Sequence, residues 1–207
     1  MFNTPRFMMA AFAALSLCAT PAAAFSFGKK SPPAQEVIEI ITVPEQLITD
    51  LQVDFDLPEN AAAAIVGNLA HESGNFRMLH EIQGTCYGYS QWCGSRKTAF
   101  RAFSKSRGGQ QTYEANYGFL KHELATQYQP MLTRLRRANS VDVAARIFMK
   151  EFLRPRASTA NLTRRVNFAK KYLRDDFSGA GCYSHFKLEA AHNPAPCPDI
   201  RMARVSS

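Results

Sequence analysis

The stretch that most constrains the fold is residues 61–72, which have the pattern of a helix that ends on a carboxylate. Pro58 suits the first turn of such a helix, where its missing N–H group is not needed. Ile65, Leu69 and Glu72 follow one another at positions i, i+4 and i+7. Glu72 is therefore expected on the same stripe as apolar residues that face a core.

The position of Glu72 predicts a carboxyl group that tends to keep its proton. Gly74 and Asn75 come directly after it and form a helix stop signal, so Glu72 is expected at the negative end of the helix dipole. Desolvation near a core also disfavours the charged form of a carboxyl group. A general acid for chemistry near neutral pH is built in this way.

A second informative segment, residues 87–92, reads Tyr-Gly-Tyr-Ser-Gln-Trp and predicts a short strand or hairpin arm. Alternation along a strand would place Tyr87, Tyr89 and Gln91 on one face. Two phenols and an amide, next to a glycine that lets other groups approach, suit a surface for a polar polymer such as a sugar chain.

Three groups of residues occur in order along the chain, and together they carry a resemblance. They are Ile65-Val66-Gly67-Asn68-Leu69 with His71-Glu72-Ser73-Gly74-Asn75-Phe76, then Gly88-Tyr89-Ser90-Gln91-Trp92 with Gly94-Ser95-Arg96, then Tyr113-Glu114-Ala115-Asn116 with Phe119-Leu120-Lys121-His122-Glu123-Leu124. From roughly Pro44 to Leu173 the chain resembles the phage tail lysozyme family, within the lysozyme and lytic transglycosylase superfamily. Helical periodicity and this resemblance together predict a mostly helical α+β, lysozyme-like domain with a short β-hairpin after the helix of residues 61–72.

The resemblance also implies roles for individual residues. Glu72 falls on the catalytic acid, and Gln91 falls on the glutamine that helps to line the glycan cleft. For Tyr113 and Asn116, a place beside that cleft and a place in the core are both open. The expected substrate-binding residues are Tyr87, Gly88, Tyr89, Ser90, Gln91, Trp92, Tyr113 and Asn116.

The activity implied by the resemblance is that of a muramidase, which cuts the β-1,4 bond between N-acetylmuramic acid and N-acetylglucosamine in peptidoglycan without a cofactor. A hydrolase needs a second carboxylate. Glu81 is the candidate, although an exposed loop glutamate is an equal reading. A lytic transglycosylase, which needs Glu72 alone and leaves anhydro ends, stays open. So do a non-catalytic glycan-binding or envelope assembly factor and a basic protein that acts on membranes.

Residues 1–24 have the features of a secretory signal: Arg6 is the positive charge, Phe7–Cys18 is mostly apolar, and Ala22–Ala24 is a small-residue cleavage site. The apolar run is short of the ~20 residues that span a membrane, so no stable membrane anchor is expected. We predict an exported protein, in the periplasm or associated with the cell wall. Envelope or secretion machinery is a possible partner.

Without that signal the chain has 24 Lys and Arg against 17 Asp and Glu, a net charge of +7. A basic exported protein is suited to anionic wall polymer or a membrane surface. Export and the even spread of the bases argue against nucleic acid. For the basic residues of the predicted helix Asn161–Leu173, which include Arg164 and Arg165, a solvated face is the favoured expectation, and a patch that binds an anionic polymer is the alternative.

The expected organisation is a leader over residues 25–43, a domain over residues 44–178 and a cysteine-containing tail over residues 179–207. Besides the helix that carries Glu72, the expected helices are Val43–Val53, 96–105 after Ser95, one capped by Thr112 that runs to Leu124, Val141–Leu153 and Asn161–Leu173.

Four cysteines follow the signal, which predicts two disulfides in an exported protein. The favoured pairs are Cys86–Cys93 and Cys182–Cys197. The first pair requires residues 87–92 to bend back as a hairpin, because an extended segment would hold the cysteines ~23 Å apart. No metal site is expected, since His71-Glu72 lacks the second histidine of the H-E-x-x-H motif at Asn75.

Overall fold

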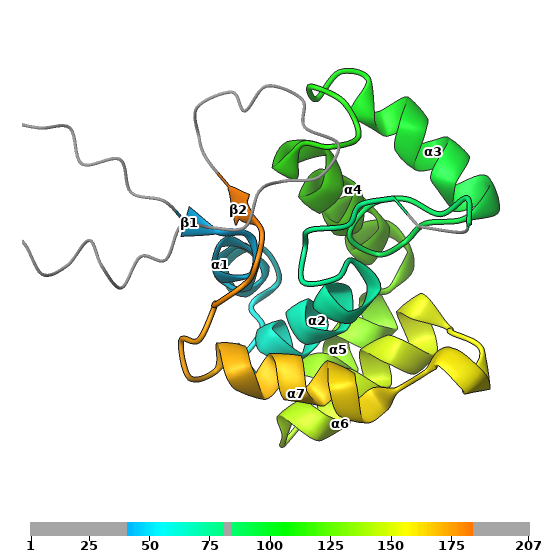
Figure 1. The fold of residues 1–207 in the computed structure, drawn as a ribbon. Helices are drawn as coiled ribbons and strands as arrows, with labels where there is room; N and C mark the ends of the chain where they lie inside the picture. The colour runs from blue at the N-terminus through cyan, green and yellow to red at the C-terminus, as the bar shows by residue number, and fades with distance from the viewer. Residues whose placement is uncertain (1–40, 81–83, 184–207) are drawn as a thin grey trace, which may run out of the picture. The chain divides into compact units, whose positions relative to one another are not determined.

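The structure is a computed structural model, which describes residues 41–80 and 84–183. The predicted signal, most of the leader, Glu81 and Cys197 lie outside the described residues. Helices dominate this part of the chain (Figure 1). The elements are β1 (Ile41–Thr42), α1 (Val43–Phe55), α2 (Glu59–Glu72), α3 (Gly94–Ser104), α4 (Tyr113–Gln127), α5 (Gln129–Arg136), α6 (Val141–Phe148), the π-helix η1 (Met149–Leu153), the 3-10 helix η2 (Ala157–Thr159), α7 (Leu162–Tyr172) and β2 (Cys182–Tyr183).

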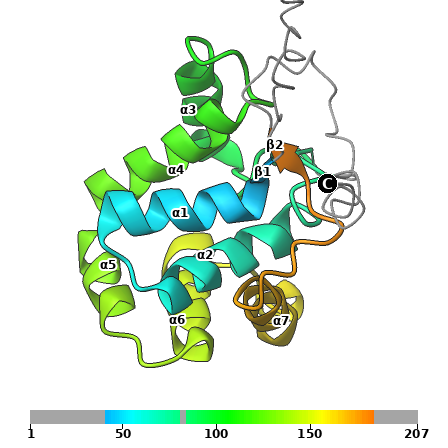
Figure 2. The same cartoon turned by 90° about the vertical axis from the view of Figure 1, so that its left-hand side faces the viewer.

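Helix α2 is the central element of the core, and it packs against α1, α6 and α7 (Figure 2). All residues from Ala61 to Ala70 are buried. Its run of alanines presents little side-chain volume, so neighbouring helices can approach closely. The approach is tightest at Gly67, where an added Cβ atom would lie 2.6 Å from two backbone atoms of α7, the nitrogen of Ala169 and the oxygen of Arg165. The small residues of α2 therefore decide how close α7 can lie.

The predicted helix starts are confirmed where a side chain caps the helix. The Thr112 hydroxyl accepts a hydrogen bond from the Ala115 backbone N–H at 3.2 Å and begins α4. The Asn161 side chain accepts one from the Arg164 N–H at 3.2 Å and begins α7. A side-chain oxygen at this position satisfies one of the N–H groups that a helix start leaves without a partner.

Two features of the helices differ from the prediction. Helix α5 was not predicted; Pro130 stands in its first turn, where proline is tolerated, and Met131, Leu132 and Leu135 are its buried residues. The predicted helix Val141–Leu153 also changes form, because Met149–Leu153 is a π-helix. Such turns in helices are frequent at functional sites, and here one buries the ring of Phe152.

The end of the described chain returns to its beginning. Strand β2 pairs antiparallel with β1, with Ile41 opposite Tyr183 and Thr42 opposite Cys182 (Figure 1). The Val43 backbone N–H donates to the carbonyl of Gly181 at 2.9 Å. Residues 181–183 therefore belong to the same folded unit as α1. The described helices include none long and apolar enough to cross a membrane.

Candidate active site

Glu72 is the last residue of α2, and the chain turns sharply after it. Gly74, Asn75 and Phe76 all have positive φ angles, of 56°, 63° and 64°. The predicted stop signal is thus confirmed. A left-handed conformation is uncommon for an aromatic residue and persists only where its surroundings impose it. Here the Phe76 N–H donates to the hydroxyl of Ser73 at 3.0 Å.

Three distant segments hold this turn. The tail contributes Gly181, whose N–H donates to the Asn75 carbonyl at 3.0 Å. Helix α7 contributes Tyr172, whose hydroxyl donates to the Asn75 side-chain oxygen. The segment after Cys86 contributes Tyr89, whose ring meets that of Phe76 edge-on with 5.2 Å between centroids. The backbone next to Glu72 is therefore fixed from three sides.

Glu72 is paired with an arginine that the sequence analysis placed on a solvated face. Nη1 of Arg165 lies 2.7 Å from Oε1 of Glu72, and the exposed fractions of the two side chains are 1% and 21%. The prediction for Arg165 is therefore wrong, because α7 turns this residue toward α2 and buries it. Proximity of the two residues was not foreseen either. Several bases occur in this helix, and only packing shows which one points inward.

His71 lies beside the same pair. Burial first, and then the positive charges of Arg165 and Arg164, lower the pKa of its imidazole to about 4. The ring is consequently neutral near pH 7. Its Nδ1 atom is buried and has no hydrogen-bond partner among the residues that the structure describes. The described residues contain no group of three His, Cys, Asp or Glu side chains placed to hold a metal ion.

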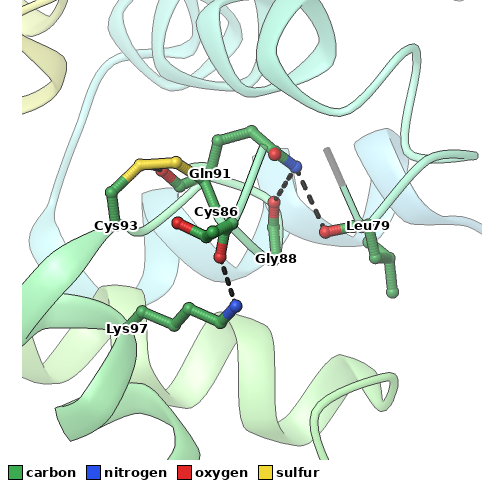
Figure 3. The surroundings of a disulfide bond; sticks show 7 residues. Leu79, Cys86, Gly88, Gln91, Cys93 and Lys97 are labelled. Carbon is green, nitrogen blue, oxygen red and sulfur yellow. Dashed lines mark hydrogen bonds between the residues drawn. A yellow bond between two sulfur atoms is a disulfide. The ribbon is translucent and has the colours of Figure 1, made fainter. Parts of the chain in front are cut away.

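Residues 86–93 form the predicted hairpin. Tyr87 and Trp92 exchange backbone hydrogen bonds of 3.0 and 2.8 Å, and the turn of residues 88–91 is closed by a 3.0 Å bond from the Gln91 N–H to the Gly88 carbonyl. The predicted disulfide between Cys86 and Cys93 joins the ends (Figure 3), with their Cα atoms 4.4 Å apart. Cys182 is also in a disulfide, and its predicted partner Cys197 lies outside the described residues.

The turn changes which way the hairpin side chains point. Alternation does not hold across residues 88–91, because they form the turn rather than a strand, and Gln91 has a φ of 47°. Tyr87 is partly buried, while Tyr89 is packed inside. Gly88 is required for close contact, since a Cβ atom there would lie 2.6 Å from the Trp92 ring and 2.7 Å from Oδ1 of Asn116. The prediction that Tyr87, Tyr89 and Gln91 share one face is therefore wrong.

Trp92 and Asn116 lie in the interior. The Trp92 side chain is 1% exposed, and its indole N–H donates to Glu123 at 2.7 Å, a carboxylate that also receives two hydrogen bonds from Arg96. Asn116 is fully buried, and its Oδ1 accepts from the Tyr89 N–H at 3.1 Å. Both residues support the hairpin from within, and for them a contact with substrate stays a prediction.

The other predicted binding residues differ in how they are held. The Tyr113 hydroxyl donates to Asp50 at 2.6 Å, and burial together with this carboxylate raises the pKa of the phenol. Ser90 is buried, and within residues 41–80 and 84–183 its hydroxyl has no hydrogen-bond partner. The amide of Gln91 donates to the carbonyls of Gly88 at 2.9 Å and Leu79 at 3.2 Å (Figure 3). Gln91 therefore connects the hairpin to the segment that follows residues 73–76, the turn after Glu72 that we call the Glu72 turn.

The Glu72 turn and the hairpin thus adjoin. Besides the contact between Phe76 and Tyr89, the Gly88 N–H donates to the carbonyl of Leu79 at 2.7 Å. Phe76 and Leu79, which make these contacts with the hairpin, follow shortly after the partly exposed carboxylate of Glu72 along the chain. A carboxyl group in this position can exchange a proton with a molecule that lies along this side of the domain.

A comparison with protein families supports a relationship. The model of the phage tail lysozyme family matches residues 45–175, which include both the Glu72 turn and the hairpin. Neither the comparison with curated proteins nor the comparison with solved structures returned a match.

Proposed function

The chain belongs to the phage tail lysozyme family, and from that premise we propose that it cleaves the glycan strands of peptidoglycan with Glu72 as the general acid. The observation that carries the proposal is the place of Glu72. It ends the buried helix α2, its side chain is 21% exposed, and the family match covers it together with the hairpin. A lysozyme-like protein needs a carboxyl group at such a boundary between core and solvent.

The proposed bond is the β-1,4 link between N-acetylmuramic acid and N-acetylglucosamine. The carboxyl O–H bond of Glu72 breaks, and its proton moves to the glycosidic oxygen. The bond from that oxygen to the anomeric carbon then breaks, and its electron pair leaves with the oxygen. The sugar passes through an oxocarbenium-like state, and Glu72 is left as a carboxylate.

Two reactions can follow the oxocarbenium-like state, and they differ in whether a second catalytic carboxylate is needed. Attack by water makes the protein a hydrolase, in which Glu81 is the proposed base or nucleophile. Attack by the 6-hydroxyl of the substrate, whose proton returns to the Glu72 carboxylate, makes it a lytic transglycosylase, which leaves anhydro ends and does not need Glu81. A protein exported to the periplasm or cell wall would meet this substrate, and envelope or secretion machinery could direct it there. Both points remain part of the proposal.

The test is mass spectrometry of the glycan ends released from purified peptidoglycan by the wild type and by Glu72→Gln. We expect Glu72→Gln to lower the rate about 10²–10⁴-fold, the usual contribution of a general acid. The matched control is Glu59→Gln, which removes the carboxylate at the opposite, exposed end of the same helix and should keep activity.

The products separate the alternatives. Reducing muramic ends indicate a hydrolase, and Glu81→Gln should then also abolish release. Anhydro ends indicate a transglycosylase, in which Glu81→Gln remains active. Activity of Glu72→Gln at the wild-type rate would refute the assignment of the acid. Release by neither protein, combined with binding to peptidoglycan, would favour a glycan-binding factor.

A further inference from the structure

We propose that Arg165 is a positioning residue for the reaction, which holds Oε1 of Glu72 so that Oε2 carries and delivers the proton. This inference rests on the proposed function and deepens it. The pairing of Nη1 with Oε1 at 2.7 Å is the contact that suggests it. In the described part of the chain, no other side chain is ion-paired with Glu72.

The guanidinium of Arg165 is buried and donates hydrogen bonds to two backbone carbonyls. Its side chain is 1% exposed. Its Nε atom donates to the carbonyl of Ala160 at 2.6 Å, and Nη1 donates to the carbonyl of Asn68 at 3.4 Å. These acceptors lie in two different segments, α2 and the residue before the Asn161 cap. A planar guanidinium with partners on two sides has little freedom to rotate.

The distance between α2 and α7 is set by their backbones. Gly67 lets the two helices touch, because any side chain there would collide with the backbone of Arg165 and Ala169. At its far end α7 is tied to the Glu72 turn through the hydrogen bond from Tyr172 to Asn75. The same helix therefore contacts both the backbone turn after Glu72, through Tyr172, and the carboxyl group of Glu72, through Arg165.

Such an arrangement stabilises the charge that develops in the reaction. When the proton leaves Oε2 for the glycosidic oxygen, the electron pair of the broken O–H bond stays on Glu72. A positive group already 2.7 Å from Oε1 meets that charge without moving, and preorganised donors of this kind carry much of enzymatic rate enhancement. His71, whose pKa is lowered to about 4 by burial and the nearby arginines, is neutral near pH 7 and does not share this task.

The experiment compares Arg165→Met, which keeps an unbranched apolar side chain but neither the charge nor the guanidinium, with Arg165→Lys, which keeps charge but not the planar fork. Lys170→Met is the matched control, since it removes an exposed base from the same helix. Kinetics on purified peptidoglycan, sedimentation with intact cell-wall sacculi and circular dichroism are measured for each. We expect Arg165→Met to lower kcat about 10²-fold, the effect of removing one preorganised donor, with KM and sacculus binding unchanged.

The conservative variant separates positioning from folding. Arg165→Lys is expected to recover part of kcat, whereas Lys170→Met should match the wild type. A folded Arg165→Met protein with the wild-type kcat would overturn the inference. If Arg165→Met does not fold, Arg165→Lys decides: a lowered kcat with unchanged KM supports the inference, and a wild-type kcat or a raised KM overturns it.

The two proposals can fail separately. Wild-type turnover by Glu72→Gln removes the proposed acid, and with it the basis for a role of Arg165. An inactive Glu72→Gln protein together with a fully active Arg165→Met protein keeps the acid and rejects Arg165 alone.

Discussion

The Glu72 turn and the Cys86–Cys93 hairpin lie next to each other, yet they hold their polar side chains in opposite ways. Glu72 is paired with a buried charge from a helix far along the chain, Arg165 of α7. Gln91 donates to the backbone carbonyls of Gly88 and Leu79, which lie only 3 and 12 residues away in the sequence. One region depends on the packing of helices, and the other depends on local turn geometry.

The difference extends to exposure. The side chain of Glu72 is 21% exposed, whereas in the hairpin Trp92 is 1% exposed and its support Asn116 is fully buried. Polar and aromatic residues that suit a sugar-binding surface are used in the hairpin as its interior. Chemistry is thus expected on the helix side, and much of the hairpin is expected to act as a scaffold.

The largest expected effect on stability tests the scaffold role of Asn116. Asn116→Ala removes the side-chain hydrogen bonds to the Tyr89 N–H and to the carbonyls of Gln110 and Thr112, of which the Thr112 carbonyl keeps its bond from the backbone N–H of residue 116. We expect the free energy of unfolding to fall by about 2–3 kcal/mol, the range for buried polar groups that lose their bonds. Urea denaturation measures the loss, and sedimentation with sacculi measures glycan binding by the folded protein.

The control is Gln110→Ala, which keeps the backbone carbonyl that Asn116 contacts and should leave stability close to that of the wild type. If Asn116→Ala keeps the stability of the wild type but no longer binds glycan, the scaffold role of the hairpin would be contradicted. Asn116 would then contact the substrate, and the hairpin would be a binding surface.

The second prediction concerns the helix side. Gly67→Ala would place a Cβ atom 2.6 Å from backbone atoms of α7, which cannot move aside as a side chain could. We expect a loss of about 1–3 kcal/mol, as for other overpacked core sites. If α7 positions Arg165, the activity of the folded protein should fall as well. Thermal unfolding and the rate of peptidoglycan cleavage are the measurements.

Gly118→Ala is the matched control, because the atoms nearest to an added Cβ atom in α4 belong to side chains, the ring of Phe103 at 3.2 Å and Nε of Arg107 at 3.8 Å. At Gly118 the higher helix propensity of alanine favours stability, and the side chain in contact can move to relieve the crowding.

A Gly67→Ala protein that is more stable than the wild type would show that α2 and α7 are not in tight contact.

The predictions from sequence that succeeded concern local structure, whereas those that failed concern the packing of distant segments. The helix that carries Glu72, its stop at Gly74 and Asn75, and the Thr112 cap follow from rules that act within a few residues, and all three are confirmed. The Cys86–Cys93 bridge, which was the favoured pairing among three possible connectivities, is confirmed, and so is the bend that it requires of the segment between the two cysteines.

What the sequence did not predict depends on three-dimensional packing. Arg165 stands among several bases in α7, and its pairing with Glu72 depends on how α7 packs against α2, where the two backbones approach closely at Gly67. Period-two alternation failed in the hairpin because the turn occupies residues 88–91. Glu81, the proposed second carboxylate, lies outside the described residues and stays a prediction.

The smallest expected effect tests the electrostatics around Arg165 through His71. Its pKa is lowered from 6.5 to about 4 in the folded protein, by burial first and then by Arg165 and Arg164. Between these two pH values the unfolded chain binds a proton that the folded protein does not, so stability is lost as the pH falls from 6.5 to about 4 and is fully present above 6.5. His71→Gln should remove this component.

We expect the change across that window to be on the order of 1 kcal/mol after solvent screening, or roughly 2–4 °C in Tm. Thermal unfolding of the wild type and His71→Gln between pH 4 and 6.5 measures it, with His122→Gln as the comparison because it removes an exposed histidine of α4 instead. An identical pH dependence in wild type and His71→Gln would contradict the prediction. A flatter dependence of Tm on pH in His71→Gln, with the wild-type dependence kept in His122→Gln, would place the pH-sensitive part of the domain on the α2–α7 side, where Glu72 and Arg165 meet.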